Sequence, residues 1–349
     1  MMKPIDILIQ YGERPTAQDL PDISLIGFSL KKMLFPHSRF REALRRIAWL
    51  HNYSQENEVG GGLLITGHSG LGKTTILQHY LDLFPRVDET NHTRIPVLYV
   101  TAPASPTVKS MAEAILVALG DPMARRGSAE EKTFRIYQLL QACQVELLMI
   151  DEFQHFCYAH SIVEFRSIAD WLKNVISLTG MGVVLCGLPE AEMVIQSNEQ
   201  LARRFSTKYA LTPFRLANDE DFKEFRGILK SFQTAIPLST EEPLYEANLA
   251  RRFLIASNGL LDYVRKILEG AVEVAESAKR ESLDVDLYAA GFRKQVWSEV
   301  PDRLNPFHPK SPLRPLIRPG EPFYAGDKRH AIGSPLARRM HNSRGNKEE

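Results

Sequence analysis

The sequence has few cysteines, almost no net charge and no long apolar run. Only three of its 349 residues are cysteine (Cys143, Cys157 and Cys186), an odd number without CxxC spacing, which argues against a disulfide framework and a cysteine-based zinc site. The 43 basic and 42 acidic residues nearly cancel, so no overall excess of charge points to a polyanionic partner. The longest uncharged run, residues 174–189, contains glycines and is shorter than the roughly 20 residues that cross a bilayer. We therefore expect a soluble, cytoplasmic protein without a secretion signal or a membrane span.

What the sequence does contain is typical of a globular protein. Apolar residues make up 44% of the chain and charged residues 24%, which excludes a wholly disordered, collagen-like or coiled-coil protein. The length exceeds one average domain of roughly 100 to 200 residues, so we expect one large domain with appendages or two domains.

Short buried strands alternate with helices over residues 60–212. The apolar runs at 63–65, 97–100, 145–150 and 182–186 have the composition of strands buried on both faces. Helical spacing follows from Ser38, from about Lys73 to Phe84, after Ser105 and Pro106, and from the capping box that begins at Ser128. This alternation predicts a three-layer α/β domain with a mostly parallel sheet.

The composition changes twice further along the chain. Three helical patterns, at 222–232, 244–256 and 260–278, follow Pro213 without further strands. Residues 301–349 then hold eight of the 21 prolines and ten basic residues against five acidic ones. The predicted divisions are an N-terminal extension with a leading helix (1–57), the α/β domain (58–213), a small all-helical lid (214–300) and an extended, mobile basic tail (301–349).

The strongest motif lies between the first predicted strand and its helix. Its sequence, Gly67-His68-Ser69-Gly70-Leu71-Gly72-Lys73-Thr74, matches the phosphate-loop spacing GxxxxGK[ST] and continues into Thr75. Loop N–H groups and the helix N-terminus would surround the phosphates of ATP, and Lys73 would reach the β and γ phosphates. The Thr74 hydroxyl would bind Mg²⁺.

Two acidic residues, Asp151 and Glu152, end the strand predicted at 145–150. The carboxyl ends of parallel strands lie at one edge of a sheet, so this pair is expected beside the phosphate loop. Asp151 would hold Mg²⁺, and Glu152 would orient and activate the water that attacks the γ phosphate. An acidic pair by itself also suits a solvated strand end.

A pair of arginines, Arg203 and Arg204, stands in the segment Leu201-Ala-Arg-Arg-Phe205. Such a pair suits a solvated helix end equally well. Alternatively, one of them is an arginine finger that a neighbouring subunit supplies to the γ phosphate, and Arg204 is our preferred residue.

These features, in this order, resemble the TniB/TnsC family of AAA+ transposition ATPases. The similarity covers roughly residues 36–290 and rests on the phosphate loop, on Val145 to Gln154 with its Ile-Asp-Glu-Phe-Gln wording, and on the box Asn198 to Phe205. Further matching segments are Val97 to Lys109, Gly182 to Gly187 and Ala256 to Gly259.

The resemblance implies an ATP-dependent regulator of DNA transposition. Such proteins form rings or helical filaments on duplex DNA when ATP is bound, and they link a target-selector protein to the transposase. ATP hydrolysis in that family dismantles the assembly. The resemblance thus implies ATP and Mg²⁺ as cofactors.

The resemblance also suggests where DNA would be contacted. The candidates are Lys109, early in a helix, and the turn residues Arg125, Arg126 and Ser128, which would touch the phosphate backbone. Lys109 also suits an ordinary exposed helix position, and Ser128 suits a helix cap.

The sequence departs from the AAA+ pattern at two positions. The strand at 182–186 runs into Gly187-Leu188-Pro189, which lacks the polar residue that many AAA+ proteins place near the γ phosphate, so slow hydrolysis is expected. In the lid, the first arginine after Gly259 is Arg265, about one turn later than usual.

Other interpretations remain open at the level of the sequence. They are an AAA+ helicase loader or another DNA-associated ATPase, a signalling NTPase of the STAND type, and a DNA scaffold that does not hydrolyse ATP. In the basic tail, Phe307, Phe323 and Tyr324 suit anchors for the transposase or the selector, while the arginines suit nonspecific DNA binding. A solvated, disordered tail is the alternative.

Overall fold

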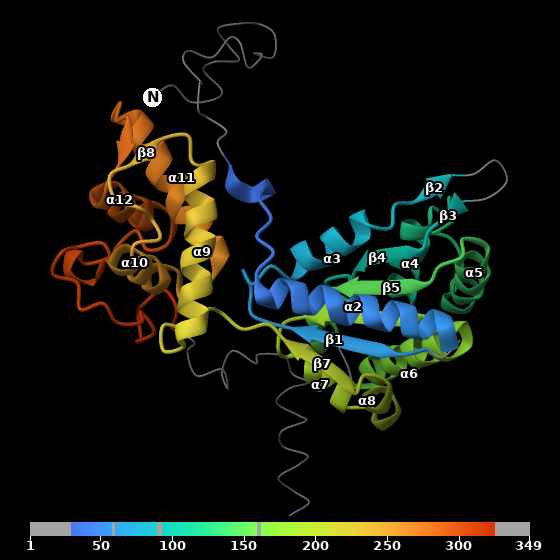
Figure 1. Cartoon of the computed structure of the whole chain (residues 1–349). Coiled ribbons are helices and arrows are strands. Elements are labelled where there is room, and N and C mark those ends of the chain that lie inside the picture. The colour runs from blue at the N-terminus through green and yellow to red at the C-terminus, as the bar shows by residue number, and fades with distance from the viewer. Residues whose placement is uncertain (1–28, 58–59, 89–92, 159–161, 325–349) are drawn as a thin grey trace, which may run out of the picture. The chain divides into compact units, whose positions relative to one another are not determined.

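The structure is a computed structural model that describes residues 29–57, 60–88, 93–158 and 162–324. Within these residues the chain divides into two compact units (Figure 1). The α/β unit contains residues 35–215, together with 260–262 and the described residues from 316 onward. The helical unit contains 29–34, 216–259 and 263–315. No helix in this described part is both long and apolar enough to cross a bilayer.

A five-stranded parallel sheet forms the centre of the α/β unit, and its strand order is β4-β5-β6-β1-β7. The strands are β1 (Gly62–Thr66), β4 (Val97–Thr101), β5 (Leu147–Asp151), β6 (Gly182–Gly187) and β7 (Thr207–Ala210). All four pairings are parallel, and β6 lies between β1 and β5. The register pairs Thr66 with Gly187 and Thr101 with Asp151, so these residues lie at one edge of the sheet. That edge carries both nucleotide motifs.

Helices cover both faces of the sheet, as the three-layer prediction requires (Figure 1). One face packs on α2 (Ser38–Asn57) and α3 (Lys73–Asp82). The other packs on α4 (Val108–Leu119), α5 (Ala129–Ala142), α6 (Ile162–Thr179), α7 (Ala191–Gln196) and α8 (Glu199–Arg204). The strands β1, β5 and β6 are buried along their whole length because successive side chains enter opposite cores.

The helix starts follow local capping chemistry. The capping box of Ser128 and Glu131 begins α5 as predicted. The predicted cap at Ser105 is wrong, because α4 begins at Val108 and Thr107 caps it. The Thr107 side chain accepts from the Ser110 N–H at 3.0 Å, while the Thr107 N–H donates to the Ser110 hydroxyl at 2.8 Å. The reciprocal cap of Thr107 and Ser110 satisfies two backbone N–H groups, whereas a simple cap by Ser105 would satisfy one, so the helix begins after Thr107.

The region expected as an N-terminal extension divides between the two units. The leading helix α2 begins at Ser38, and its buried residues Phe40, Ala43 and Ile47 pack on the sheet, so it belongs to the α/β unit. Before it, a 3₁₀ turn at Leu30–Lys32 belongs to the helical unit, where the Leu30 N–H donates to Glu269 Oε1 at 2.7 Å. Residues 1–28 of the predicted N-terminal extension lie outside the described part of the chain.

The helical unit contains four helices longer than two turns within the described residues. They are α9 (Asp219–Ala235), α10 (Ala247–Ser257), α11 (Leu261–Ser277) and α12 (Val285–Gln295). The sequence patterns predicted the first three and missed α12, which Asp284 caps through the Leu287 N–H at 2.8 Å. A short parallel pairing of β8 (Ser239–Thr240) with β9 (Ser282–Leu283) is the one departure from an all-helical unit within these residues.

The first part of the basic tail is folded, which corrects the prediction of a mobile segment from residue 301. Phe307 is 1% exposed, and its ring lies 4.9 Å from that of Phe253 in an edge-to-face contact. Arg252 Nη1 donates to the carbonyls of Pro306 at 2.6 Å and His308 at 3.0 Å. Apart from a 3₁₀ turn at Asp302–Leu304, the segment has no helix or strand in its described residues, but one buried ring and these hydrogen bonds fix its path. Residues 325–349 lie outside the described part.

Candidate nucleotide-binding site

The phosphate-loop motif lies between β1 and α3, the strand–turn–helix setting that its chemistry requires. The Gly67 N–H donates to the Gly187 carbonyl at 3.1 Å, which joins the start of the turn to β6. Gly70 and Gly72 have φ angles of 82° and 80°, a left-handed conformation that strains other residues. The turn leads directly into α3, which has no side-chain cap. The first N–H groups of a helix have no partner within the helix, so the start of α3 favours the binding of an anion.

Lys73 is the first residue of α3 and is 8% exposed. Its Nζ donates to the carbonyls of Gly67 at 2.8 Å and His68 at 3.1 Å. The ammonium group thus lies against the turn, beside the backbone N–H groups at the start of the helix. Positive charge and backbone donors together form an arrangement that binds phosphate.

Asp151, the last residue of β5, is 1% exposed and fully hydrogen-bonded. Its Oδ2 accepts from the Thr74 hydroxyl at 2.7 Å and from the Tyr99 hydroxyl at 3.1 Å. Its Oδ1 accepts from the Glu152 N–H at 2.8 Å. The structure therefore brings Thr74 and Asp151, which are 77 positions apart in the sequence, into direct contact.

The pair Thr74 and Asp151 fits Mg²⁺. Both donors are oxygen, and Mg²⁺ is usually held by one or two protein ligands together with water and substrate phosphates. The described residues contain no cluster of three His, Cys, Asp or Glu side chains that could hold a metal ion.

Tyr99 is a neighbour of Asp151 that the sequence analysis missed. It lies in β4, and both burial and the nearby Asp151 carboxylate raise its pKa. The phenol therefore stays neutral and donates to the carboxylate at physiological pH. The only signal in the sequence was a tyrosine two residues before the end of a strand, and it does not by itself distinguish the site from the core.

Glu152 follows β5 directly and has a backbone φ of 56°. For a residue other than glycine this conformation costs about 1 kcal/mol or more, and such strain is common at active sites. Its carboxylate accepts a hydrogen bond from the side-chain amide of Gln154. Glu152 is thus held beside Asp151 at the edge of the sheet that carries the phosphate loop.

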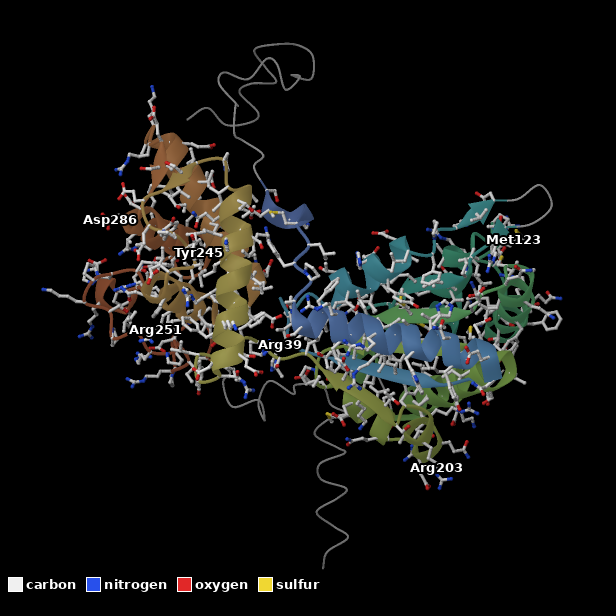
Figure 2. All side chains as sticks on the ribbon, viewed as in Figure 1. Arg39, Met123, Arg203, Tyr245, Arg251 and Asp286 are labelled. Atoms are coloured by element: carbon white, nitrogen blue, oxygen red, sulfur yellow. The ribbon has the colours of Figure 1, made fainter. Side chains whose placement is uncertain are left out.

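The two arginines of α8 have different surroundings. Arg203 is 76% exposed and pairs with Glu199 at 2.5 Å, and Figure 2 shows it on the outer side of the unit. Arg204 donates to the Ser177 hydroxyl at 2.8 Å and to the Gly60 carbonyl at 3.4 Å. Gly60 precedes β1, whereas the phosphate loop follows it, so Arg204 is bound at the opposite end of this strand from the loop. Arg204 is thus held away from the phosphate loop of its own chain by these two hydrogen bonds.

The family described as bacterial TniB protein matches residues 25–215, which is more than half of the chain. This chain belongs to the TniB family. No curated relative matches it at a significant level.

Solved structures share the fold of this TniB-family chain at low sequence identity. The Aeropyrum pernix ORC2 protein, in ADPNP-ADP complexes, has a TM-score of 0.56 and 16% identity over 79% of this chain and 71% of that one. Cdc6p from Pyrobaculum aerophilum has a TM-score of 0.55 and 16% identity, over 81% and 73%. Drosophila ORC bound to DNA has a TM-score of 0.52 and 16% identity, over 83% and 73%. The fold is therefore that of the AAA+ P-loop proteins.

The candidate DNA contacts lie on α4 and on the turn before α5. Lys109, Arg125, Arg126 and Ser128 are all exposed. The buried Lys132 joins the two segments, because its Nζ bonds both to Glu113, one turn after Lys109, and to the Ala124 carbonyl. These positions thus lie on two segments that Lys132 connects, and Ser128 is also occupied as the cap of α5.

Arg265, the late arginine of the lid, is bound within the helical unit. It pairs with Glu269 at 2.5 Å, and Glu269 also accepts from the Leu30 N–H. This pair gives the arginine a structural role in its own unit.

Proposed function

We propose that this TniB-family protein is an ATP-dependent, DNA-binding regulator of DNA transposition. It assembles on duplex target DNA with ATP bound and links a target-selector protein to the transposase. Hydrolysis of ATP to ADP and phosphate then dismantles the assembly.

The observation that carries the proposal is the contact between Thr74 and Asp151 beside Lys73. It joins the two nucleotide motifs across β6 into one site, within a chain that belongs to the TniB family. The alternative, that the acidic pair is only a solvated strand end, does not explain why Asp151 is buried against a threonine of the phosphate loop.

Each side chain has a distinct task in the proposed reaction. The loop N–H groups and Lys73 bind the β and γ phosphates, while Thr74 and Asp151 hold Mg²⁺. The ion, when bound, neutralises charge on the phosphate oxygens. Glu152 accepts a proton from the attacking water, and water oxygen bonds to the γ phosphorus as the bond to the ADP oxygen breaks.

The position of Arg204 supports a requirement for assembly. An arginine at the far end of β1 reaches a nucleotide only if that nucleotide is bound to another subunit. Hydrolysis would then depend on the ring or filament, and it would stay slow in a free subunit.

The surface that contains Lys109, Arg125 and Arg126 is the proposed contact with the DNA backbone. Contacts of lysine and arginine with phosphates carry little sequence information, which suits a protein that must accept many target sequences. The solved structures of ORC bound to DNA support such a use of the fold.

The experiment that tests the proposal is electron microscopy of the purified protein with a duplex of about 60 base pairs. Samples with ATP or a slowly hydrolysed analogue are compared with samples that contain ADP or no nucleotide. Rings or filaments on DNA only in the ATP state are the expected result. Dispersed particles in every state would contradict assembly on DNA, and would favour a helicase loader or a signalling NTPase.

A further inference from the structure

Gln154 is a buried polar residue in the 3₁₀ turn η2 (Phe153–Tyr158), and it makes two hydrogen bonds that meet at the candidate site. Its Nε2 donates to Glu152 Oε2, and its Oε1 accepts from the Leu188 N–H at 2.9 Å. Only 4% of the residue is exposed. Because the Leu188 N–H can only donate, it fixes the amide oxygen on its side and turns the amide nitrogen toward Glu152.

The backbone that carries Gln154 is held firmly. Its neighbours Phe153 and Phe156 are each 1% exposed, and their ring centroids lie 4.5 Å apart in the core beneath the sheet edge. A side chain anchored in this way loses little further freedom when it makes a hydrogen bond. The amide is therefore suited to hold another group in a fixed direction.

The Gln154 amide fits beside the end of β6 because the last residue of that strand, Gly187, has no side chain. A Cβ atom on Gly187 would lie 2.6 Å from Gln154 Oε1 and 3.0 Å from the Gln154 backbone nitrogen. A side chain at residue 187 and the present position of Gln154 therefore exclude one another. Gly187 also accepts from the Gly67 N–H, so the same residue borders both the phosphate loop and Gln154.

We propose that Gln154 is a positioning residue that sets the direction of the Glu152 carboxylate for water activation. β6 ends in glycine and supplies no side chain of its own to this place, so the amide reaches it from η2. The inference rests on the proposed function, because it assigns a task within the same ATPase site.

The connection continues toward the arginine pair. Leu188 begins the turn into α7, which packs on η2, and α8 with Arg204 follows directly. The backbone that orients the amide is thus the backbone that leads to the proposed intersubunit contact. Glu152 is thus connected to α8 through the Gln154 side chain, the turn at Leu188 and α7.

Gln154→Glu is the decisive substitution. It keeps the size of the side chain and an oxygen for the Leu188 N–H, but it replaces the donor to Glu152 with a second carboxylate oxygen. We expect kcat for ATP hydrolysis in the presence of DNA to fall about tenfold while KM for ATP stays within about twofold. Gln154→Leu, which loses both hydrogen bonds, should have at least the same effect.

Two further variants test whether the effect passes through Glu152. In a Glu152→Gln background, adding Gln154→Glu should lower kcat no further, since the two residues act as one unit. Gly187→Ala displaces the amide from the opposite side, and it should reproduce the kcat loss even if a Gln154 variant folds poorly. Gln196→Glu is the matched control, because Gln196 donates to Glu192 at 3.1 Å on the exposed face of α7.

The outcomes separate this inference from the proposed function. If the wild-type protein hydrolyses ATP and Gln154→Glu keeps kcat within about twofold, the positioning role is wrong and the ATPase stands. A loss that is fully additive with Glu152→Gln would also overturn it. If the wild-type protein does not hydrolyse ATP on DNA, both the function and the inference fail.

Discussion

At the scale of single residues, the site depends on charged side chains whose hydrogen-bond partners are neutral groups. Lys73 donates to backbone carbonyls and Asp151 accepts from two hydroxyls, so no charge is left buried without a partner. Thr74 and Glu152 belong to the same set of contacts, and their substitutions give the sharpest tests of it.

Glu152→Gln should lower kcat for ATP hydrolysis about 100-fold without preventing ATP binding, because the amide cannot accept a proton from water. Assemblies on DNA should then persist after ATP addition instead of dispersing. Time-resolved electron microscopy and phosphate release measure the two effects. Glu241→Gln, an exposed change in the helical unit, is the control. Unchanged turnover in Glu152→Gln would remove the water-activating role.

Thr74→Ala should raise the Mg²⁺ concentration needed for half-maximal hydrolysis about tenfold, because the hydroxyl is one of the two protein oxygens at the ion. Thr74→Ser keeps the hydroxyl and should behave as the wild type. A titration of ATPase rate against Mg²⁺ compares the three proteins. Equal Mg²⁺ requirements in all of them would show that Thr74 does not bind the ion.

At the scale of elements, the arrangement of strands and helices determines which residues can act together. β6 lies between the strands that lead into the phosphate loop and the acidic pair, so the site is built around the end of β6. α8 lies at the opposite end of β1. This separation supports the proposal that Arg204 acts on the nucleotide of a neighbouring subunit.

A subunit-mixing experiment tests this separation. Arg204→Ala and Lys73→Ala should each be nearly inactive alone, the former by roughly a thousandfold as expected for an arginine finger. Mixed together on DNA they should regain activity, since one subunit supplies the arginine and the other the nucleotide site. Arg203→Ala should retain activity. A mixture as inactive as its components would contradict an action between subunits.

The contact of α2 with α3 and with Glu146, the residue before β5, should make stability depend on pH. His51 is 3% exposed and bonds to Tyr80 at 2.9 Å and Glu146 at 3.0 Å, and burial lowers its pKa. The neutral imidazole is therefore favoured by folding, so this stabilisation is complete above pH 6.5 and decreases as the pH falls below it. Burial also raises the pKa of Tyr80 to about 12, which keeps it a donor.

Urea unfolding between pH 7.5 and 5.5 measures the effect of His51. The wild type should lose more stability on acidification than His51→Gln, whose amide does not titrate. The difference between the two proteins, rather than the trend of either, reports on His51. Parallel pH dependences would show that the imidazole titrates alike in the folded and unfolded chains.

At the scale of the whole molecule, the boundary between folded chain and tail lies beyond Phe307. Phe307 and Asn305 join the loop after α12 to the core of the helical unit, where Asn305 Nδ2 donates to the Ala289 carbonyl at 3.0 Å. Phe307 is thus unavailable as an anchor for a partner. Tyr324, at 46% exposed, keeps that proposed role.

Phe307→Ala should destabilise the helical unit by about 3 kcal/mol, because it leaves a cavity against Phe253 and Tyr288. Tyr324→Ala, a change at an exposed side chain, should leave stability unchanged, so it is the suitable variant for testing recruitment of the transposase or the selector. Urea denaturation distinguishes the two variants. A Phe307→Ala protein as stable as the wild type would show that Phe307 does not contribute to the folded helical unit.

The sequence by itself determined the α/β alternation, the capping box at Ser128, the phosphate loop and the acidic pair. These features depend on local periodicity, on backbone conformations near glycine and on short-range hydrogen bonds, all of which a short stretch of sequence encodes. The helix α12 was missed because Gly291, a residue type that disfavours helix interiors, stands within its short pattern. The cap of α4 was misplaced because several polar residues compete there.

Only the tertiary structure decided which distant residues meet. Tyr99 carries no motif, and Gln154 stands in the Ile-Asp-Glu-Phe-Gln segment without a task that the sequence assigns. They became part of the site because β4 ends and η2 begins at the same edge of the sheet as the phosphate loop. The folded start of the tail likewise depended on a core that Phe253 and Tyr288 build from separate helices. Strand order and packing bring together residues far apart in the chain, and no local pattern records that order.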